Sequence, residues 1–538
     1  LLPRAERPAL APRIAVGLVT GTLGLPILVR LVAARDRAAV AAAGFLAWAV
    51  LGAAVSGSWL TWSGEFVYGT GALFVLTLGG YWALGRTLPA DAVRFAVAGF
   101  VAGAVANAVV AMAQGPLDLG AYGLSLYDER STGLFSNPLY LGATAAAAVA
   151  LLPVLATTRP LVAVGAMFVL VAGAQMSGGR ISVALAVVAA LWCAARLRGV
   201  LGVALVVVMV AGLATGSVLP SNREETAASR ITDPTRGLES RTKVWETGLR
   251  AARDKPVLGT GPGRFLAATG HRITLEQARV DGPDRVYLDA HNLFVQYAAT
   301  MGFVGLALLA GWLFLAGRAA RPRLHPEVVG AALVLAASHM VEPQNVVLTP
   351  LMFLLLGAAA AAARAPGSDS PRLVRRLSWM PAVAASVLAA VVLAGDIRLH
   401  SAVIDADVQG ARTARRLLWP WAAPLQAETS MHVFKGTTSA PNGSRDRAPA
   451  ELRAARASAQ AAIRREPDDW RLYVELGGVL RLLDDRAGAA AAYAQGLRRN
   501  PWSHLALTGR ASTLEAMQRT AAADACRRLD RLAADESA

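Results

Sequence analysis

Long apolar stretches recur along this chain, each about the length that a helix needs to cross a bilayer, roughly 20 residues. The predicted spans lie near 13–33, 38–56, 66–85, 92–113, 138–156, 159–176, 181–196, 199–219, 292–316, 327–342, 346–363 and 378–395. This pattern predicts an all-α fold, a polytopic bundle of about 12 transmembrane helices. The third stretch and the one at 327–342 are the weakest candidates.

The composition agrees with a membrane protein and argues against a nucleic-acid-binding one. The chain is 55% hydrophobic and 17% charged, whereas soluble domains carry about 25% charged residues. The net charge of +16 comes almost entirely from arginine, since only three lysines occur. Basic residues in a polytopic protein mark cytoplasmic loops and lipid headgroup contacts. No basic stripe with interleaved aromatic residues is present, so we expect no nucleic-acid partner.

The distribution of arginines predicts how the bundle is oriented. One set of short loops carries most of them, and by the positive-inside tendency these loops are cytoplasmic. These arginines are Arg30, Arg35, Arg37, Arg86, Arg94, Arg159, Arg196, Arg198, Arg318, Arg321, Arg323, Arg372, Arg375 and Arg376. Residues 220–290 and everything after about 396 then lie outside the cytoplasm. The N-terminal Arg4, Arg7 and Arg13 do not fit, and a preceding helix would resolve the conflict.

These features divide the chain into five parts on a multi-pass protein of the plasma membrane. Residues 1–219 and 291–395 are the two blocks of transmembrane helices. Residues 220–290 form a large extracytoplasmic loop between them, residues 396–445 a membrane-proximal connector, and residues 446–538 a helical domain outside the cytoplasm.

The C-terminal part has a period of its own. Pro467 and Pro501 are 34 residues apart, which is the tetratricopeptide repeat length. Large and small residues, such as Tyr473 and Ala489, occupy the positions expected from that phase. This predicts a tetratricopeptide-like helical tail that binds protein or glycan, with an ordinary helical hairpin domain as the alternative.

Residues suited to phosphate chemistry stand at the predicted outer ends of helices. Arg180 precedes an apolar helix, and Arg241 shares a helix face with Trp245 at the i, i+4 spacing. A guanidinium group presents a planar fork of donors that fits a phosphate. The alternatives are an arginine that anchors lipid headgroups and an amphipathic helix that rests at the membrane surface.

His291 and Asn292 open the apolar helix that follows the polar loop. Histidine can take up a proton near neutral pH, and Asp289 is close enough in sequence to orient the ring. A purely structural histidine is the alternative. No second histidine, cysteine or carboxylate stands at metal-ligand spacing, so we expect no metal. The glycine-rich run 259–263 lacks the lysine and serine of a nucleotide-binding loop and predicts a tight turn instead.

Taken in order, these motifs resemble the O-antigen ligase and polymerase family of membrane glycosyltransferases. The matching segments are RSTGLFSNPLYLG (130–142), SGGR (177–180), SRTKVW (240–245), GTGPGRF (259–265) and HN followed by MGFVGL (291–306). The resemblance covers roughly 125 to 365, and a tetratricopeptide tail is similar to that on some family members. It implies a GT-C-like bundle that transfers a glycan from a polyprenyl diphosphate carrier to an acceptor hydroxyl, without nucleotide sugar, cofactor or metal.

The resemblance also implies roles for individual residues. Arg180 and Arg241 match the arginines that hold the carrier diphosphate, and His291 matches the histidine proposed to activate the acceptor hydroxyl. Supporting positions are Arg130, Asn137, Trp245, Asp289 and Asn292. The expected partners are a polyprenyl-diphosphate-linked glycan donor, a glycan, lipid or protein acceptor, membrane lipids and a protein bound by the tail. Whether the enzyme is a ligase or a polymerase stays open.

Two other functions remain as alternatives. A transporter of a small anion or a glycan precursor would place ionisable residues near the bilayer midplane on broken helices. The spans contain few polar exceptions, namely Asn107 and the His339–Glu342 pair near a predicted outer end. The third reading is a non-catalytic membrane scaffold that recruits partners through the tail.

Overall fold

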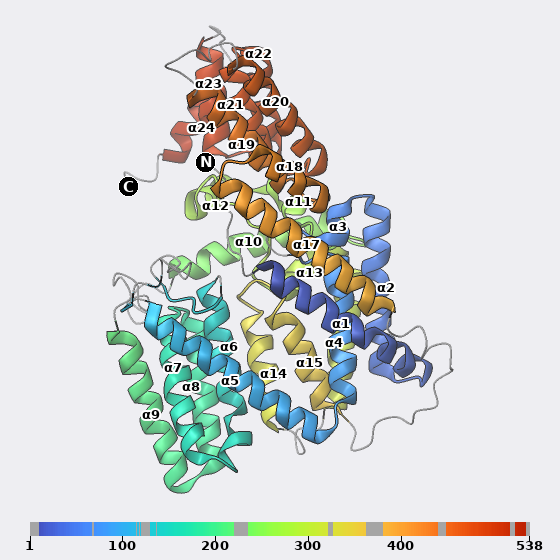
Figure 1. Cartoon of the computed structure of the whole chain (residues 1–538), viewed down its shortest axis with the longest axis vertical. Coiled ribbons are helices and arrows are strands. Elements are labelled where there is room, and N and C mark those ends of the chain that lie inside the picture. The colour runs from blue at the N-terminus through green and yellow to red at the C-terminus, as the bar shows by residue number, and fades with distance from the viewer. Residues whose placement is uncertain are drawn as a thin grey trace.

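The computed structural model places helices along nearly all of the chain that it describes (Figure 1). The described residues are 10–66, 69–114, 116–117, 119, 130–135, 137–219, 235–320, 326–361, 380–438, 448–516 and 522–533. Several arginines used above to orient the bundle lie outside them: Arg4, Arg7, Arg321, Arg323, Arg372, Arg375 and Arg376.

A helix lies at each of the twelve apolar stretches. These helices are α1 (Leu10–Ala33), α2 (Arg37–Ser56), α4 (Ala72–Thr87), α5 (Ala90–Gln114), α6 (Pro138–Ala156), α7 (Pro160–Met176), α8 (Arg180–Leu197), α9 (Gly199–Val218), α13 (Leu293–Ala319), α14 (Pro326–Ser338), α15 (Leu348–Ala359) and α17 (Met380–Ile404). Within the described residues, eight of them are long and apolar enough to cross a membrane. The chain is therefore a polytopic helical membrane protein.

Four of the twelve helices have fewer than 18 residues, so the described part of the chain bears out eight spans by length and composition, and the full count of about 12 stays a prediction. Helices α4, α7, α14 and α15 have 16, 17, 13 and 12 residues. The reason is clearest at α14 and α15, where a polar segment, 339–347, interrupts the apolar pattern. Asn345 ends this segment by capping α15, since its Oδ1 accepts hydrogen bonds from Val347 N and Leu348 N at 3.0 and 2.7 Å.

The core of the bundle is built around aromatic side chains from four helices. Trp312 of α13 stacks on Phe353 of α15 with ring centroids 4.6 Å apart. Phe45 of α2 and Trp82 of α4 meet the same indole at 5.9 and 6.1 Å. All four side chains are buried. Such contacts hold α2, α4, α13 and α15 in a fixed arrangement below the polar segments.

The described part of the polar loop 220–290 folds into helices that cover one end of the bundle. They are α10 (Thr235–Asp254), α11 (Phe265–Thr269) and α12 (Leu275–Asp281). The short helix α3 (Trp59–Ser63), from the first block, lies at the same end. Between α10 and α11 the glycine-rich run turns tightly, which confirms the predicted turn: Gly259, Gly261 and Gly263 all have positive φ. Gly261 N donates to Thr300 O at 2.8 Å, so the turn rests on α13.

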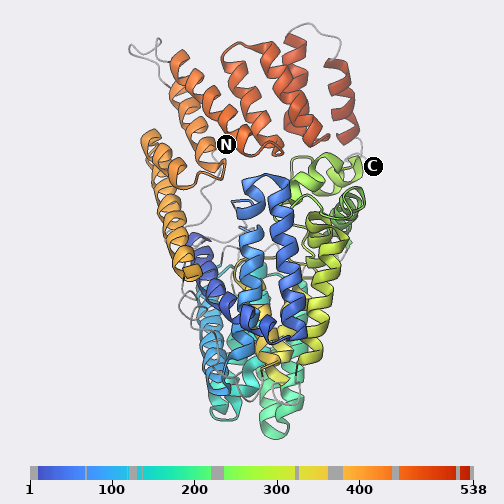
Figure 2. The ribbon, with the colours of Figure 1, turned by 90° about the vertical axis from the view of Figure 1, so that its right-hand side faces the viewer.

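The same end carries the C-terminal domain, which we define as α18 to α24 (Figures 1 and 2). Its helices are α18 (Val408–Leu417), α19 (Ala423–Thr438), α20 (Ala448–Arg465), α21 (Trp470–Leu482), α22 (Arg486–Arg499), α23 (His504–Ala516) and α24 (Ala522–Ala533). Successive helices pack against each other as hairpins. Trp470 and His504, which begin α21 and α23, are separated by the predicted 34-residue period.

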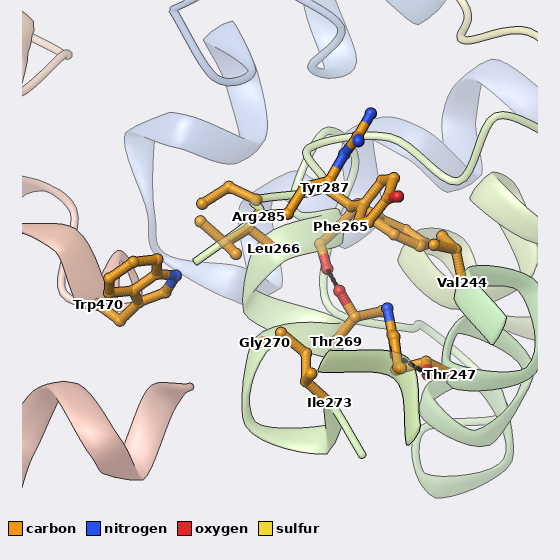
Figure 3. A pocket seen from close by; sticks show the side chains of 12 residues that line it. Val244, Thr247, Phe265, Leu266, Thr269, Gly270, Ile273, Arg285, Tyr287 and Trp470 are labelled. Atoms are coloured by element: carbon orange, nitrogen blue, oxygen red, sulfur yellow. Dashed lines mark hydrogen bonds between the residues drawn. The ribbon is translucent and has the colours of Figure 1, made fainter. Parts of the chain in front are cut away.

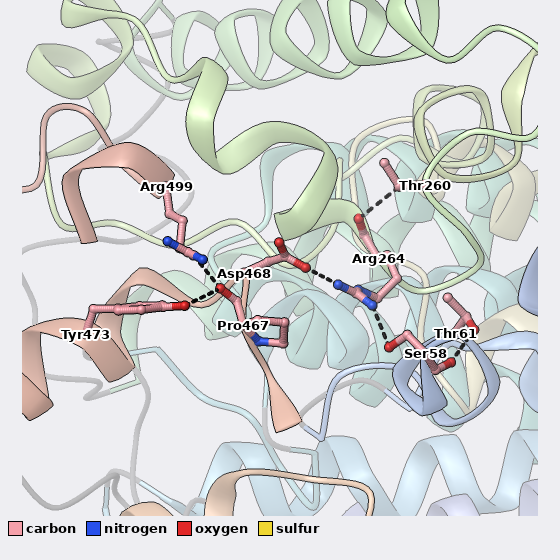
Figure 4. Close-up of polar contacts among 8 residues, drawn as sticks. All are labelled: Ser58, Thr61, Thr260, Arg264, Pro467, Asp468, Tyr473 and Arg499. Atoms are coloured by element: carbon pink, nitrogen blue, oxygen red, sulfur yellow. Dashed lines mark hydrogen bonds and ion pairs between the residues drawn. The ribbon is translucent and has the colours of Figure 1, made fainter. Parts of the chain in front are cut away.

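Arg264 connects this domain to the rest of the molecule (Figure 4). Its side chain is buried, donates to Ser58 Oγ at 2.7 Å and forms an ion pair with Asp468. Nearby, Trp421 Nε1 donates to Gly64 O at 2.9 Å. The first block of helices, the polar loop and the C-terminal domain therefore meet at one guanidinium group.

A second set of contacts holds the turn between α12 and α13. Asn500 Nδ2 donates to Pro283 O at 2.9 Å, and Ser503 Oγ donates to Asp284 Oδ1 at 2.7 Å. These bonds fix the backbone a few residues before Tyr287. The C-terminal domain thus helps to place the segment that leads to His291.

Replacing Arg264 with alanine is expected to lower the free energy of unfolding by about 1.5–3 kcal/mol, the usual worth of hydrogen bonds to a charged group. The matched control is Arg398→Ala, because the ion pair of Arg398 with Asp407 is half exposed and exposed pairs contribute about 0–1 kcal/mol. Thermal unfolding of both variants in detergent measures the difference. Equal stability of the two variants would show that Arg264 does not hold the domains together.

Candidate functional site

Arg180 is the first residue of α8, at the end of the bundle that α10 to α12 cover. The turn before it is held by Ser177, whose Oγ accepts a hydrogen bond from Gly179 N at 3.2 Å and donates to Ala174 O at 2.6 Å. A helix N-terminus carries unpaired N–H groups and a partial positive charge. The start of α8 therefore adds positive potential beside a residue that is itself positive.

Arg241 and Trp245 lie one turn apart on α10, as predicted. Trp245 is partly buried, and its Nε1 donates to Ala290 O at 3.0 Å. The indole also packs with Val244, Ala290 and the start of α13. Trp245 thus fastens the helix that carries Arg241 to the residue directly before His291.

His291 is held in an uncommon backbone conformation. Its φ is +53°, a left-handed value that few residues other than glycine adopt. Its N–H donates to Asp289 Oδ1 at 2.7 Å, which stabilises this turn. The ring of Tyr287 meets the imidazole edge-on, with centroids 5.9 Å apart.

The imidazole is oriented by a backbone group. Nδ1 lies 3.1 Å from Asp289 O. A carbonyl oxygen can only accept, so Nδ1 carries the proton and Nε2 keeps its lone pair. Asp289 thus contacts the ring as expected, through its backbone carbonyl, while its carboxylate binds the backbone N–H of His291.

Asn292 serves as the N-cap of α13. Its Oδ1 accepts from Phe294 N and Val295 N at 3.0 and 3.1 Å, and its Nδ2 donates to Met340 O at 3.0 Å. Its role is to start the helix and to tie it to segment 339–347. Asn137 is likewise a cap, since its side chain accepts from Leu139 N at 2.9 Å at the start of α6.

Arg180 and Arg130 lie close enough to Arg241 for their charges to lower its pKa. Burial lowers the pKa of Arg241 most, the positive charges of Arg180 and Arg130 lower it further, and Glu342 and Tyr287 raise it. Charges act on each other this strongly only over short distances in a poorly solvated site. Arg130, Arg180 and Arg241, which are far apart in the sequence, therefore share one site.

The positive charge of Arg241 also acts on His291. Burial lowers the pKa of His291 to about 4, the hydrogen bond to Asp289 raises it, and the charges of Arg241 and Arg285 lower it. The ring is therefore neutral at neutral pH, with Nε2 available to accept a proton. Arg241 therefore lies within electrostatic reach of both His291 and Arg180.

Segment 339–347 contacts both α13 and α8 at this site. Leu293 N donates to His339 O at 2.9 Å, and Tyr297 Oη donates to Gln344 Oε1 at 3.1 Å. Glu342 is buried, and its Oε1 accepts a hydrogen bond from Ser182 Oγ of α8 at 3.0 Å. Glu342 is the main residue that sequence reasoning left outside the site. The sequence signal that could have found it is a carboxyl group at the end of an apolar run.

A small pocket adjoins the site (Figure 3). Its walls come from α10, α11, α12, the segment 285–287 and the first residue of α21. Tyr287 and Arg285 belong both to this pocket and to the surroundings of His291. Trp470 closes the pocket from the C-terminal domain, and its indole nitrogen is on the side that faces the other lining residues.

Within the described residues, no three His, Cys, Asp or Glu side chains are grouped so that they could hold a metal ion. The charged groups that surround His291 are mainly guanidinium groups, which bind anions. The geometry therefore suits a ligand with phosphate groups that binds between the start of α8 and the part of α10 that carries Arg241.

Comparison with known families decides the identity of this part of the chain. Residues 160–310 match the family model described as O-antigen ligase. They form an O-antigen ligase family domain. Arg180, Arg241 and His291 all lie inside it. No curated protein matches the chain.

The O-antigen ligase domain runs from α7 through most of α13, so it contains both the polar loop and the helices that flank it. Arg130 and Glu342 lie outside the match, although the structure places them beside it. The match also ends well before the tail, so the tetratricopeptide character of the C-terminal domain stays a prediction.

Proposed function

We propose that this O-antigen ligase family protein is a membrane glycosyltransferase. It moves a glycan from a polyprenyl diphosphate carrier to an acceptor hydroxyl on the extracytoplasmic side of the plasma membrane, for cell-surface polysaccharide assembly. The observation that carries the proposal is the convergence of Arg180, Arg241 and a neutral His291 within the family domain.

The positions of the helix ends support an extracytoplasmic site. Arg35, Arg159 and Arg198 lie in the turns α1–α2, α6–α7 and α8–α9, and Arg86 lies in the last turn of α4, just before the α4–α5 turn. They lie at the opposite ends of these helices from the site. Arginine-rich turns favour the cytoplasm, so the site faces the other side, where lipid-linked glycans are used.

The proposed reaction is a direct displacement at the anomeric carbon. The acceptor oxygen forms the new C–O bond while His291 Nε2 takes its proton. The bond from the anomeric carbon to the diphosphate oxygen breaks, and its electron pair leaves with the carrier diphosphate. The configuration is inverted because attack and departure occur on opposite faces. Arg180 and Arg241 stabilise the charge that develops on the leaving group.

Donor binding and base strength are linked in this mechanism. In the empty site, burial lowers the pKa of His291 most, and the charges of Arg241 and Arg285 lower it further. A bound diphosphate brings negative charge, which offsets the field of the arginines and raises the pKa of the imidazole. His291 therefore becomes a stronger base only when the donor is present.

The test is turnover by the full chain in vesicles, with a polyprenyl-diphosphate oligosaccharide and candidate acceptors. A lengthened lipid-linked product would identify a polymerase. Product moved to a new lipid, glycan or protein anchor would identify a ligase. Movement of the substrate across the vesicle membrane without any new glycosidic bond would contradict the proposal and indicate a carrier.

Treatment with EDTA is expected to leave turnover unchanged, because guanidinium groups neutralise the departing diphosphate in this mechanism. The measurement is the initial rate with and without chelator at saturating donor. Loss of activity that added Mg²⁺ restores would show that a metal ion takes part in the reaction.

A further inference from the structure

The position of Glu342 is unexpected for a site that binds a diphosphate. Its side chain is only 2% exposed. It accepts a hydrogen bond from Ser182, the third residue of α8. It also interacts electrostatically with Arg241 of α10. A carboxylate and a diphosphate both carry negative charge, so in ionised form they would compete for the same guanidinium group.

We propose that Glu342 is a positioning residue of the diphosphate site. Its carboxyl group holds Arg241 and Ser182 in place while the site is empty, and it carries a proton whenever the donor diphosphate is bound. Wherever Glu342 is ionised in the empty site, donor binding is therefore coupled to proton uptake. The inference rests on the proposed function, because it names the residue that tunes the affinity for the donor.

The physical reason is the cost of like charges in a buried site. Two anions beside one arginine repel each other strongly where water is excluded. Protonation of the weaker acid removes that repulsion, as it does in buried pairs of carboxylates. Burial already raises the pKa of Glu342 to about 8, although Arg241 lowers it. A bound diphosphate raises the pKa further.

Asp289 is the neighbouring group that titrates in the same range as Glu342, since burial raises its pKa to about 7. A pH dependence that comes from Asp289 would persist in Glu342→Gln. The guanidinium group of Arg241 stays protonated in this range. His291 titrates far below it, at a pKa of about 4, and burial raises the pKa of Tyr287 above its usual value near 10. The donor is a diester of diphosphoric acid, so its own charge is constant near neutral pH and above.

The sign of the pH dependence follows. Below a pH of about 8, Glu342 is already protonated in the empty site, and the donor binds without taking up a proton. Above it, each donor bound must take up a proton, so donor affinity falls by about tenfold per pH unit. A glutamine has the same shape and no charge to titrate, so it removes this dependence.

The experiment measures the donor KM of the full chain against pH in the wild type and in Glu342→Gln. The probe is farnesyl-diphosphate-linked N-acetylglucosamine, and turnover is followed at each pH. We expect the wild-type KM to rise by about tenfold per pH unit on the alkaline side and the KM of Glu342→Gln to stay flat. A wild-type pH dependence that persists in Glu342→Gln would overturn the proposal.

The matched control is Glu327→Gln at the other end of α14, where Glu327 pairs with Arg196 at 3.1 Å. It should keep the wild-type pH profile, and a flat profile in this variant would overturn the assignment to Glu342.

Calorimetry of the same probe in buffers of different ionisation enthalpy measures the proton uptake directly in the wild type. Binding on the alkaline side without proton uptake also overturns the proposal. Absence of transfer by the wild type at every pH would instead count against the proposed function, and the calorimetric result would still decide the role of Glu342.

Discussion

Replacing His291 with asparagine is expected to reduce glycan transfer by about 10²–10⁴-fold, the usual contribution of a general base. The donor KM should change little, because Arg180 and Arg241 remain. Asparagine is a better replacement than alanine, since it adopts the left-handed backbone that residue 291 requires. The loss can then be assigned to the missing imidazole and not to a strained turn. Initial rates at saturating donor and acceptor measure it.

The matched control for this variant is His271→Asn. His271 lies in the same polar loop, in the turn Gly270–Arg272, and is exposed. It should keep full activity. Full activity in His291→Asn, with the protein present in the membrane at its normal level, would remove the proton-accepting role from the mechanism.

The pH profile of the wild type gives a further check on His291. The rate requires a neutral imidazole, so it falls as the pH drops through the pKa of that group. In kcat/KM the pKa is that of the free enzyme, about 4. In kcat it belongs to the donor complex, where the diphosphate raises the pKa. The acid limb of kcat should therefore lie at higher pH than the acid limb of kcat/KM.

Replacing Arg241 with alanine is expected to lower kcat by about 10²–10³-fold, as removal of one group that stabilises developing charge does in other enzymes. The loss should appear in kcat because the charge on the leaving diphosphate grows as the bond breaks. Arg241→Lys should recover part of the rate, since it keeps the charge and loses the planar fork. Single-turnover rates with saturating donor separate the chemical step from product release.

The control on the same helix is Arg250→Ala. Arg250 pairs with Glu246 at 3.1 Å in a partly exposed i, i+4 contact, and such pairs contribute little. The double variant of Arg180 and Arg241 adds a second test. If both guanidinium groups hold one diphosphate, the losses should not simply add, because groups that act as a unit are non-additive. Independent losses would mean that the two arginines act at different places.

Much of the local structure could be predicted because it depends on residues close together in the chain. Arg241 and Trp245 share a helix face through the i, i+4 spacing alone, and positive φ at three glycines follows from the run 259–263. The helix at each apolar stretch follows in the same way. The lengths of α14 and α15 were missed because a few polar residues inside an apolar run do not show whether the helix continues through them or ends there.

The sequence predicted several residues of the candidate site but not the contacts between them. His291 and Asp289 are near neighbours, yet the sequence does not distinguish a carboxylate that orients the ring from a carbonyl that does so. Glu342 had no partner that could be named, because Ser182 is 160 residues away. The family match places three of the residues in one domain without saying how their charges interact.

The amino-acid sequence by itself determined that the chain is helical, that it lies in a membrane and that its polar loop carries arginines and a histidine, because hydrophobic length, period and residue chemistry are properties of short segments. Only the tertiary structure decided that Arg130, Arg180, Glu342 and His291 all lie within electrostatic reach of Arg241. The packing of α6, α8, α10, α13 and α14 brings these residues together, and burial then turns their separate charges into a coupled set. Those pKa shifts come from excluded water and neighbouring charges, and neither exists until the helices have assembled.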